Sequence, residues 1–472
     1  MESAKTYGSD RSRQLKKSSG RFPRRMAGSA NGTPHPVIIE GRFGYAILAL
    51  TISLACSILI PDAIAQTVPT VAFVGGHWFN GRSFENKTGY AVDDRLTFRR
   101  PVHVDRTVDL HQGFVIPPFG EAHNHNVETL NKVGTLVATY LRHGIFYVKN
   151  PNNLARDRDV LRPMLNLPDT IDLAFANGSL TGSGGHPMEI PERVIRTGRW
   201  TTADAEGGFY YTVDDESDLE KKWPILLGTH PDFIKTYLLY SDQYSRRRDN
   251  TQFYAWKGLN PNLLKAIVQK AHAAGLRVST HIEDAADFHN ALMAGVDEIN
   301  HMPGFRYGSD VEKHAITEFE ISEADARLAA KQQTFVVTTL SAGALQLEAN
   351  QRTEQDQLNA KNLRLLLRHH VHLALGSDAY RSDTLPEALY INSLHVMDSA
   401  TLLNIWSTFT AETIFPRRKI GLLKEGYEAS FLVLGANPIE NFAAVEQITL
   451  SVKQGHVFDL AKLSNDAANR AQ

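Results

Sequence analysis

Cysteine is almost absent from this sequence. Cys56 is the one cysteine among 472 residues, and it lies in an N-terminal segment with the features of a cleaved leader. Once that segment is removed, the chain can form no disulfide and can use no thiolate as a metal ligand or nucleophile. Any metal site in the remaining chain must therefore be built from nitrogen and oxygen ligands.

A surplus of charge of one sign is also missing. The formal net charge is -2, and residues 1–65 hold nine Lys or Arg against four Asp or Glu, which leaves -7 for residues 66–472. A weakly acidic chain has no general basic surface to attract nucleic acid. We therefore expect a small-molecule substrate and no nucleic-acid partner, while assembly into a homo-oligomer stays open.

Long hydrophobic runs are equally scarce. Residues 45–60 form an apolar run that follows nine basic residues and precedes Pro61 and the small-residue site Ala63-Ile64-Ala65. This order is typical of a secretory signal peptide. The run is short for spanning a hydrocarbon core of ~30 Å, although an uncleaved membrane anchor is the alternative. We expect residues 1–65 to be a signal peptide with an extended basic leader, cleaved after Ala65. The mature protein would be periplasmic or secreted, without stable membrane association.

Both ends of the remaining chain are rich in β-strand patterns. Residues 66–113 alternate apolar and polar side chains between turn residues, and the same pattern returns in residues 426–435 and 448–458. Such segments read as strands and hairpins. We expect residues 66–113 and 417–472 to build one small β-sandwich domain together.

The central part, residues 114–416, alternates short apolar runs with helix-like segments. Helical spacing is clear in residues 261–274, 284–294, 322–333 and 355–370. Eight apolar runs alternate with such segments: 114–125, 144–149, 171–177, 232–239, 276–282, 296–301, 334–340 and 371–378. The pattern predicts an α/β fold, a (β/α)8 TIM-type barrel with its active site at the carboxyl ends of the strands. Residues 179–230 are too long for one unit and should cover the barrel mouth.

The first of these runs ends in a pair of histidines. Residues 114–126 read FVIPPFGEAHNHN, with His123 and His125 one residue apart. If the strand continues to the histidines, its two-residue period directs both rings to one face, where they can converge on one ion.

Four further residues with metal-binding or proton-transfer chemistry lie in or at the ends of predicted strands: Lys235, His281, His301 and Asp378. Each has an ordinary alternative, because a lysine can extend to solvent, a histidine can be a core residue and an aspartate can cap a helix. Independent core residues have no reason to recur at the same end of so many strands. The coincidence favours one shared site.

The order of these motifs resembles the metal-dependent amidohydrolase superfamily, in its imidazolonepropionase-like or prolidase-like branch. EAHNHN resembles the D-x-H-x-H motif of that family, DEINHMPG its strand-six histidine, and ALGSDA its strand-eight aspartate. Residues 437–457 resemble its closing β segment, so the resemblance covers residues 68–458. One departure is Glu121, where many members have Asp.

The resemblance implies a pair of divalent metal ions. It places His123, His125 and Asp378 on one ion and His281 and His301 on the other, with Lys235 bridging them as a carbamate. It also makes Asp378 the general acid and base of a hydrolysis. Nitrogen and oxygen ligands suit Zn first, and also Mn, Fe, Co or Ni. If Lys235 is unmodified, a mononuclear site on the histidines and Asp378 is the alternative.

Substrate contacts are harder to assign. The loop GSGGHP, residues 182–187, brings His186 near a predicted strand end, although a flexible loop with an incidental histidine fits equally well. The remaining candidates follow strand ends, where such side chains also serve packing: Tyr237, Tyr240, Arg306 and Tyr307.

These features predict an exported metal-dependent amidohydrolase that cleaves a C–N bond in an amide, a cyclic amide or a small peptide. The same ligands would serve a lactonase or a phosphotriesterase. A non-catalytic metal-containing binding protein is a third alternative, but structural zinc sites are closed and often use thiolates.

Overall fold

The computed structural model describes residues 69–458, apart from the side chains of residues 349 and 350. The predicted signal peptide lies outside these residues. Within residues 69–458, no helix is both long enough and apolar enough to cross a bilayer.

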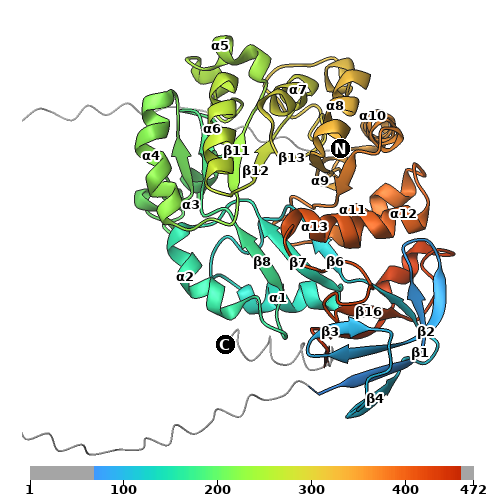
Figure 1. Cartoon of the computed structure of the whole chain (residues 1–472). Coiled ribbons are helices and arrows are strands. Elements are labelled where there is room, and N and C mark those ends of the chain that lie inside the picture. Colours follow the sequence, from blue (N-terminus) through green and yellow to red (C-terminus); the bar gives the residue numbers. More distant parts are fainter. Residues whose placement is uncertain (1–68, 459–472) are drawn as a thin grey trace, which may run out of the picture. The chain divides into compact units, whose positions relative to one another are not determined.

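One eight-stranded sheet joins the two ends of the described chain (Figure 1). Its strand order is β18-β17-β16-β5-β1-β2-β3, and β4 pairs with β1. The strands are β1 (Val71–Phe79), β2 (Phe84–Val92), β3 (Arg95–Thr97), β4 (Arg106–Asp109), β5 (Phe114–Ile116), β16 (Phe431–Leu434), β17 (Ile448–Lys453) and β18 (His456–Phe458). Because β16 pairs with both β17 and β5, the C-terminal strands extend the N-terminal ones. The ends share one sheet as expected, but a β-sandwich is not confirmed.

The central strands form two parallel sheets. A three-stranded sheet has the order β6-β7-β8, and a seven-stranded sheet has the order β10-β9-β11-β12-β13-β14-β15. The strands are β6 (Phe119–Glu121), β7 (Ile145–Asn150), β8 (Asp172–Phe175), β9 (Ser179–Thr181), β10 (Tyr210–Thr212), β11 (Ile234–Tyr237), β12 (Val278–His281), β13 (Glu298–Asn300), β14 (Phe335–Val337) and β15 (His372–Ala374). Parallel strands alternating with helices confirm the α/β class.

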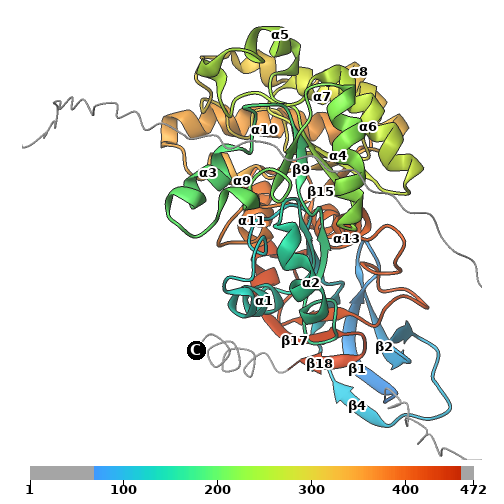
Figure 2. The same cartoon turned by 90° about the vertical axis from the view of Figure 1, so that its left-hand side faces the viewer.

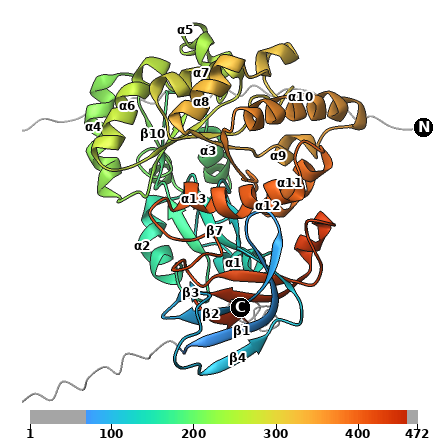
Figure 3. The same cartoon turned by 45° about the vertical axis from the view of Figure 1, so that its right-hand side comes forward.

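Helices cover the outside of the parallel strands. Figures 2 and 3 show α6, α7, α8 and α10 side by side around them. The α-helices are α1 (Val133–Arg142), α2 (Arg158–Leu161), α3 (Glu189–Arg196), α4 (Glu216–Gly228), α5 (Tyr244–Arg247), α6 (Pro261–Ala273), α7 (Ala285–Ala294), α8 (Glu323–Gln332), α9 (Ser341–Ala344), α10 (Ala349–Arg368), α11 (Thr384–Ser393), α12 (Ser399–Asn404) and α13 (Thr410–Ile414). Helix α7 illustrates the local signals, since the Asp284 side chain caps its first turn and Gly295 ends it in the left-handed conformation.

The two parallel sheets approach each other at both edges. At one edge the amide of Ala122 donates to the carbonyl of Leu375 at 2.8 Å, and the amide of Asp378 donates to the carbonyl of His123 at 2.9 Å. At the other edge of the three-stranded sheet, the carbonyl of Phe175 in β8 accepts from the amide of Asp232, which precedes β11, at 2.8 Å. These are single bonds outside the strand ladders, so the described strands do not form one closed ladder.

The first predicted strand is divided in two. Strand β5 ends at Ile116 and joins the terminal sheet, whereas β6 begins at Phe119 and joins the three-stranded sheet. Pro117 and Pro118 separate them, because proline has no N–H to continue a ladder. Both histidines lie beyond the end of β6. The prediction that strand alternation aligns His123 and His125 was therefore wrong.

Candidate metal centre

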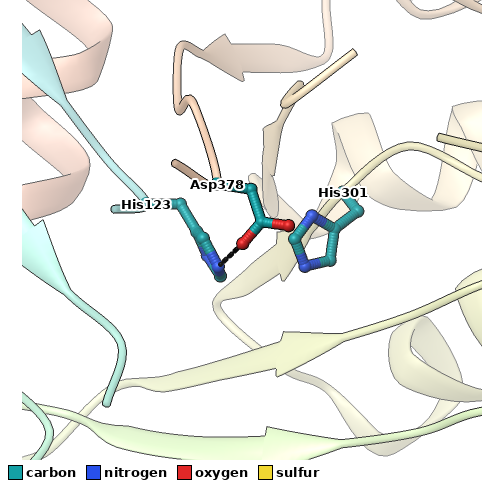
Figure 4. A group of neighbouring side chains, drawn as sticks. All are labelled: His123, His301 and Asp378. Carbon is teal, nitrogen blue, oxygen red and sulfur yellow. Dashed lines mark ion pairs between the residues drawn. The ribbon is translucent and has the colours of Figure 1, made fainter. Parts of the chain in front are cut away.

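Three side chains from different strand ends converge on one point. The metal-ligating atoms of His123, His301 and Asp378 all lie within 4.8 Å of one another (Figure 4). His123 Nε2 is 3.2 Å from Asp378 Oδ1, and the rings of His123 and His301 have centroids 4.6 Å apart. The residues follow β6, β13 and β15, so the carboxyl ends of three parallel strands supply the group.

His125 joins this group through the same carboxylate oxygen. Its Nε2 is 3.1 Å from Asp378 Oδ1, and its Nδ1 is 2.5 Å from Glu128 Oε1. A carboxylate on the far nitrogen of a ligating imidazole fixes the ring and raises its basicity. Sequence reasoning missed Glu128, although an acid three residues after a predicted ligand is a usable signal.

Backbone conformation directs the other two members. His301 has φ 75° and Asp378 has φ 51°, both in the left-handed region that costs non-glycine residues about 1–3 kcal/mol. Thr339, with φ 52°, lies beside them, and its Oγ1 is 2.7 Å from His301 Nδ1. Phe305 stacks on the His301 ring at 4.0 Å. Such strained positions gather at functional sites, where surrounding contacts hold them.

His281 and Lys235 lie next to this group. The ring of His281 is 4.5 Å from that of His301, and its Nε2 is 3.0 Å from Glu283 Oε1. Lys235 is 1% exposed and donates to Asn300 Oδ1. The structure thus brings all six predicted ligands into one region.

Burial keeps most of the imidazoles neutral. It lowers the pKa of His123 to about 3 and holds the pKa of His281 and His301 well below the usual range. His125 differs: burial opposes its charge, but Glu128 and Asp378 outweigh burial and raise its pKa to about 9. Neutral imidazoles have a free nitrogen lone pair for a metal.

The pKa values of Asp378 and Lys235 are both lowered, which favours an ionised carboxylate and a neutral amine. Burial disfavours the charge on Asp378, but hydrogen bonds from His123 and His125 hold its pKa well below the usual range. Burial lowers the pKa of Lys235 to about 7.

These residues fit a divalent cation. Two imidazole nitrogens meet one carboxylate oxygen at 3.2 and 3.1 Å, so three ligand atoms already converge. A cysteine-free set of imidazole and carboxylate suits zinc and its neighbours in the first transition row.

A cavity of about 150 Å³ opens onto the group, and three of the five predicted substrate-binding residues line it: His186, Tyr237 and Arg306. His186 Nδ1 is 2.7 Å from Glu189 Oε1, and Arg306 donates to Glu283. The cavity therefore has polar side chains facing the candidate metal centre.

The other two predicted substrate-binding residues lie elsewhere. Tyr240 stacks on His314 at 4.6 Å and lies 4.0 Å below the Arg247 guanidinium. Tyr307 packs edge-on against Phe319 at 5.4 Å. Neither Tyr240 nor Tyr307 lines the cavity.

Sequence reasoning missed four residues that do line it: Glu189, Ile190, Arg193 and Tyr380. Glu189 and Arg193 come from α3, within the excursion expected over the barrel mouth, and Tyr380 stacks on His125 at 5.0 Å. The position of Tyr380, two residues after Asp378, was a signal. Nothing in the spacing of α3 identifies which side chains turn inward.

The sequence of residues 252–458 matches the model of the amidohydrolase family. The match covers less than half of the chain, and it makes this part of the chain similar to the amidohydrolase family. It contains His281, His301 and Asp378, three of the predicted ligands. A search of curated proteins found no match.

The fold matches those of several solved hydrolases. Ochratoxinase from A. niger has a TM-score of 0.64 at 16% identity, covering 83% of this chain and 96% of that chain. Molinate hydrolase has a TM-score of 0.65 at 15% identity, covering 84% and 96%. A prolidase complexed with N-methylphosphonate-L-proline has a TM-score of 0.61 at 17% identity, covering 83% and 99%. At such low sequence identity, the structural similarity to these proteins shows the fold alone.

The match to the amidohydrolase family confirms the predicted enzyme class, a hydrolase that acts on carbon–nitrogen bonds.

Proposed function

We propose that this protein is an exported metal-dependent amidohydrolase that cleaves the C–N bond of an amide, a cyclic amide or a small peptide. One observation carries the proposal: His123 and His125 meet Asp378 Oδ1 beside His301, at the base of a polar cavity. The similar fold of the prolidase complexed with N-methylphosphonate-L-proline supports a small peptide or amide as substrate.

The proposed scaffold is a closed (β/α)8 barrel. Strands β6 to β8 would form one part of its wall and β9 to β15 the other. The backbone hydrogen bonds at both edges support closure, since Ala122 reaches Leu375 on one side and Asp232 reaches Phe175 on the other. Closure would direct every strand end that carries a predicted ligand toward one mouth.

The metal centre would hold two divalent cations, with Zn the first candidate and Mn, Fe, Co or Ni the alternatives. His123, His125 and Asp378 would hold one ion, and His281 and His301 the other. Bound cations supply Lewis acidity, which lowers the pKa of water and polarises a carbonyl oxygen.

Lys235 would be carboxylated. Its neutral amine donates a lone pair to the carbon of CO2, an N–C bond forms, one proton leaves to solvent, and a carbamate anion results. The pKa of about 7 that burial gives this lysine makes the neutral amine abundant near neutral pH. Carboxylation would also remove a buried cation, which is costly to leave unpaired.

The side chains divide the remaining work. Asp378 would accept a proton from the attacking water and return it to the leaving nitrogen. His186, Tyr237 and Arg306 would orient the substrate from the cavity wall. Tyr240 and Tyr307 would act behind that wall, because they pack in the same apolar cluster as Tyr237.

Export would follow from the leader of residues 1–65. The expected mature protein begins at Gln66, with residues 66–113 and 417–472 forming the terminal β domain around a barrel of residues 114–416. N-terminal sequencing of protein recovered from the exported fraction tests this. An intact leader held in the membrane fraction would contradict cleavage.

The catalytic proposal is tested with Asp378→Asn. We expect hydrolysis of a substrate found by screening amides, dipeptides and lactones to fall by about 100-fold to 10,000-fold, because the proton carrier is lost. Metal content should largely persist, since the amide oxygen can still ligate. Unchanged turnover in the variant would contradict the role of Asp378, and wild-type turnover of lactones alone would contradict the C–N assignment.

A further inference from the structure

Glu298 is a buried carboxylate among the parallel strands. It contacts Lys149 directly and is linked to Lys235 through Asn300. Glu298, on β13, is 1% exposed and accepts a hydrogen bond from Lys149 Nζ on β7 at 2.7 Å. Thr413 Oγ1 donates to the same oxygen, Oε2, and Ser279 Oγ lies 2.7 Å from the other oxygen, Oε1. The contacts described for Asp378 and the histidines do not include Glu298, so the proposed reaction leaves it without a role.

Glu298 fixes the orientation of the Asn300 amide. Asn300 Nδ2 donates to Glu298 Oε1 at 2.9 Å. An ionised carboxylate only accepts hydrogen bonds, so the NH2 end of the amide must face it. The reversed amide would set two acceptors against each other at that distance. Asn300 Oδ1 is therefore turned toward Lys235 Nζ, which donates to it.

This orientation matters for a modified lysine. A lysine carbamate keeps one N–H, and its two oxygens lie at the other end of a planar group. An acceptor fixed beside the nitrogen holds that N–H and leaves the oxygens directed away from Asn300. A donor in the same place would attract the oxygens instead.

We propose that Glu298 is a positioning residue for Lys235: by fixing the Asn300 amide, it holds the carbamate nitrogen and directs the carbamate oxygens toward the metal centre. The proposal rests on the proposed function, because it requires Lys235 to be carboxylated.

Lys149 completes the arrangement by its charge. Its ammonium is 3% exposed, pairs with Glu298 and lies 4.6 Å from the centroid of the Phe233 ring. The pair is neutral together, so the carbamate anion forms next to a neutral network rather than beside an unpaired carboxylate. Two unpaired anions at this spacing would disfavour each other.

A purely structural ion pair is the competing explanation. Buried pairs often contribute little net stability, and removing one partner alone costs about 3–5 kcal/mol by leaving an unpaired charge. Single charge removals would therefore confuse positioning with unfolding. The test needs variants that remove both charges together.

The experiment compares two double variants. Lys149→Met with Glu298→Gln keeps an acceptor for Asn300 Nδ2, whereas Lys149→Met with Glu298→Leu removes it. Asn300→Leu removes the acceptor beside Lys235 directly. Asp172→Asn with Lys453→Met is the control, because it removes both charges of an equally buried ion pair, at 2.7 Å, outside the candidate metal centre.

Two readouts besides activity are measured on each protein: the lysine carbamate signal by carbon NMR after growth and purification with 13C-bicarbonate, and metal per chain by elemental analysis. We expect full signals in wild type, in the Gln double variant and in the Asp172→Asn with Lys453→Met control. We expect loss of the carbamate signal and of at least one metal ion per chain in the Leu double variant and in Asn300→Leu.

The outcomes separate the two proposals. Full carbamate and metal in the Leu double variant and in Asn300→Leu would overturn the positioning role while leaving the hydrolase proposal intact. A wild-type protein without carbamate would overturn both the bridging lysine and this inference. If the Leu double variant fails to fold, a full carbamate signal in folded Asn300→Leu would by itself overturn the inference.

Discussion

Asp378 Oδ1 contacts the Nε2 atoms of both His123 and His125. The Nδ1 atoms on the far sides of the two rings have different surroundings. The Nδ1 of His125 contacts Glu128, whereas the buried Nδ1 of His123 has no partner among the described residues. The two histidines therefore differ in charge, with pKa values of about 9 and about 3. Glu128 is the residue that sets this difference.

Glu128→Gln should weaken metal binding by about 10-fold to 100-fold, because a neutral amide holds the His125 ring less firmly and makes it less basic. Competition with a chelator measures the change. Glu323→Gln is the matched control, since Glu323 pairs with His369 at 2.5 Å on the exposed surface. Equal affinities in the Glu128 variant and wild type would contradict a role for Glu128 in the centre.

At the scale of single residues, the sequence indicated the chemistry better than the geometry. The six side chains that lie together in the structure could be predicted as a group because His, Lys and Asp recurred at strand ends. Glu128 and Thr339 could not, because their roles depend on which ring nitrogen they face. Tyr240 was predicted to line the cavity because it follows a strand. Its backbone is in the left-handed region, with φ 49°, and its ring stacks on His314 instead.

The segment between β15 and α11 carries Asp378 and passes close to the segment after β6. Gly376 allows this approach. A Cβ at Gly376 would lie 2.6 Å from Val337 Cγ1 and 2.8 Å from His123 Cβ, so no larger residue fits without displacing a predicted ligand.

Gly376→Ala should destabilise the protein by about 1–3 kcal/mol through overpacking and should weaken metal binding by shifting His123. Chemical unfolding and a metal titration measure the two effects. Gly134→Ala in α1 is the control, because a Cβ there meets nothing within 4 Å and alanine favours a helix by about 1 kcal/mol. A Gly376 variant as stable as wild type, with unchanged metal affinity, would contradict the close approach.

Element boundaries were predictable where caps and breakers are local. Asp284 and Gly295 mark α7 in the sequence and in the structure. Pro117 and Pro118 also indicate a break in the strand. The residues on both sides of them are apolar, however, so the sequence did not show that β5 and β6 belong to different sheets. Helix α3 could be placed only as part of an excursion, because its position over the cavity depends on tertiary packing.

Buried ion pairs join strands that lie far apart in the sequence. Lys149 in β7 pairs with Glu298 in β13, and Lys453 in β17 pairs with Asp172 in β8. Burial disfavours the charge on Glu298, but the charges of Lys149 and Arg277 and the hydrogen bonds from Lys149 and Thr413 together outweigh burial and lower its pKa to about 2, against an ordinary value of 4.5. A carboxyl whose pKa is depressed by folding contributes stability above pH 4.5 and loses it as the pH falls toward 2.

Wild type should therefore lose about 2 kcal/mol more unfolding free energy between pH 5 and pH 3 than the variant Lys149→Met with Glu298→Gln, which has no such group. Urea unfolding at a series of pH values measures the difference. Parallel curves for the two proteins would show that Glu298 is not held ionised by Lys149.

At this scale, the α/β class and the shared sheet of the two chain ends followed from periodicity and turn residues. The contacts between the edges of the two parallel sheets did not, because they are single hydrogen bonds such as that between Ala122 and Leu375. The number of sheets in the terminal domain also could not be predicted. Alternating apolar residues show that one face of a strand is buried, but they do not show which element covers that face.

Metal binding at the proposed centre should depend on Lys235. Elemental analysis measures metal per chain on protein purified without added metal, for wild type and Lys235→Ala side by side. We expect about two divalent ions per wild-type chain and loss of at least one in the variant. No metal in wild type, even after reconstitution, would contradict the metal centre, and one ion in both proteins would contradict the bridging role of Lys235.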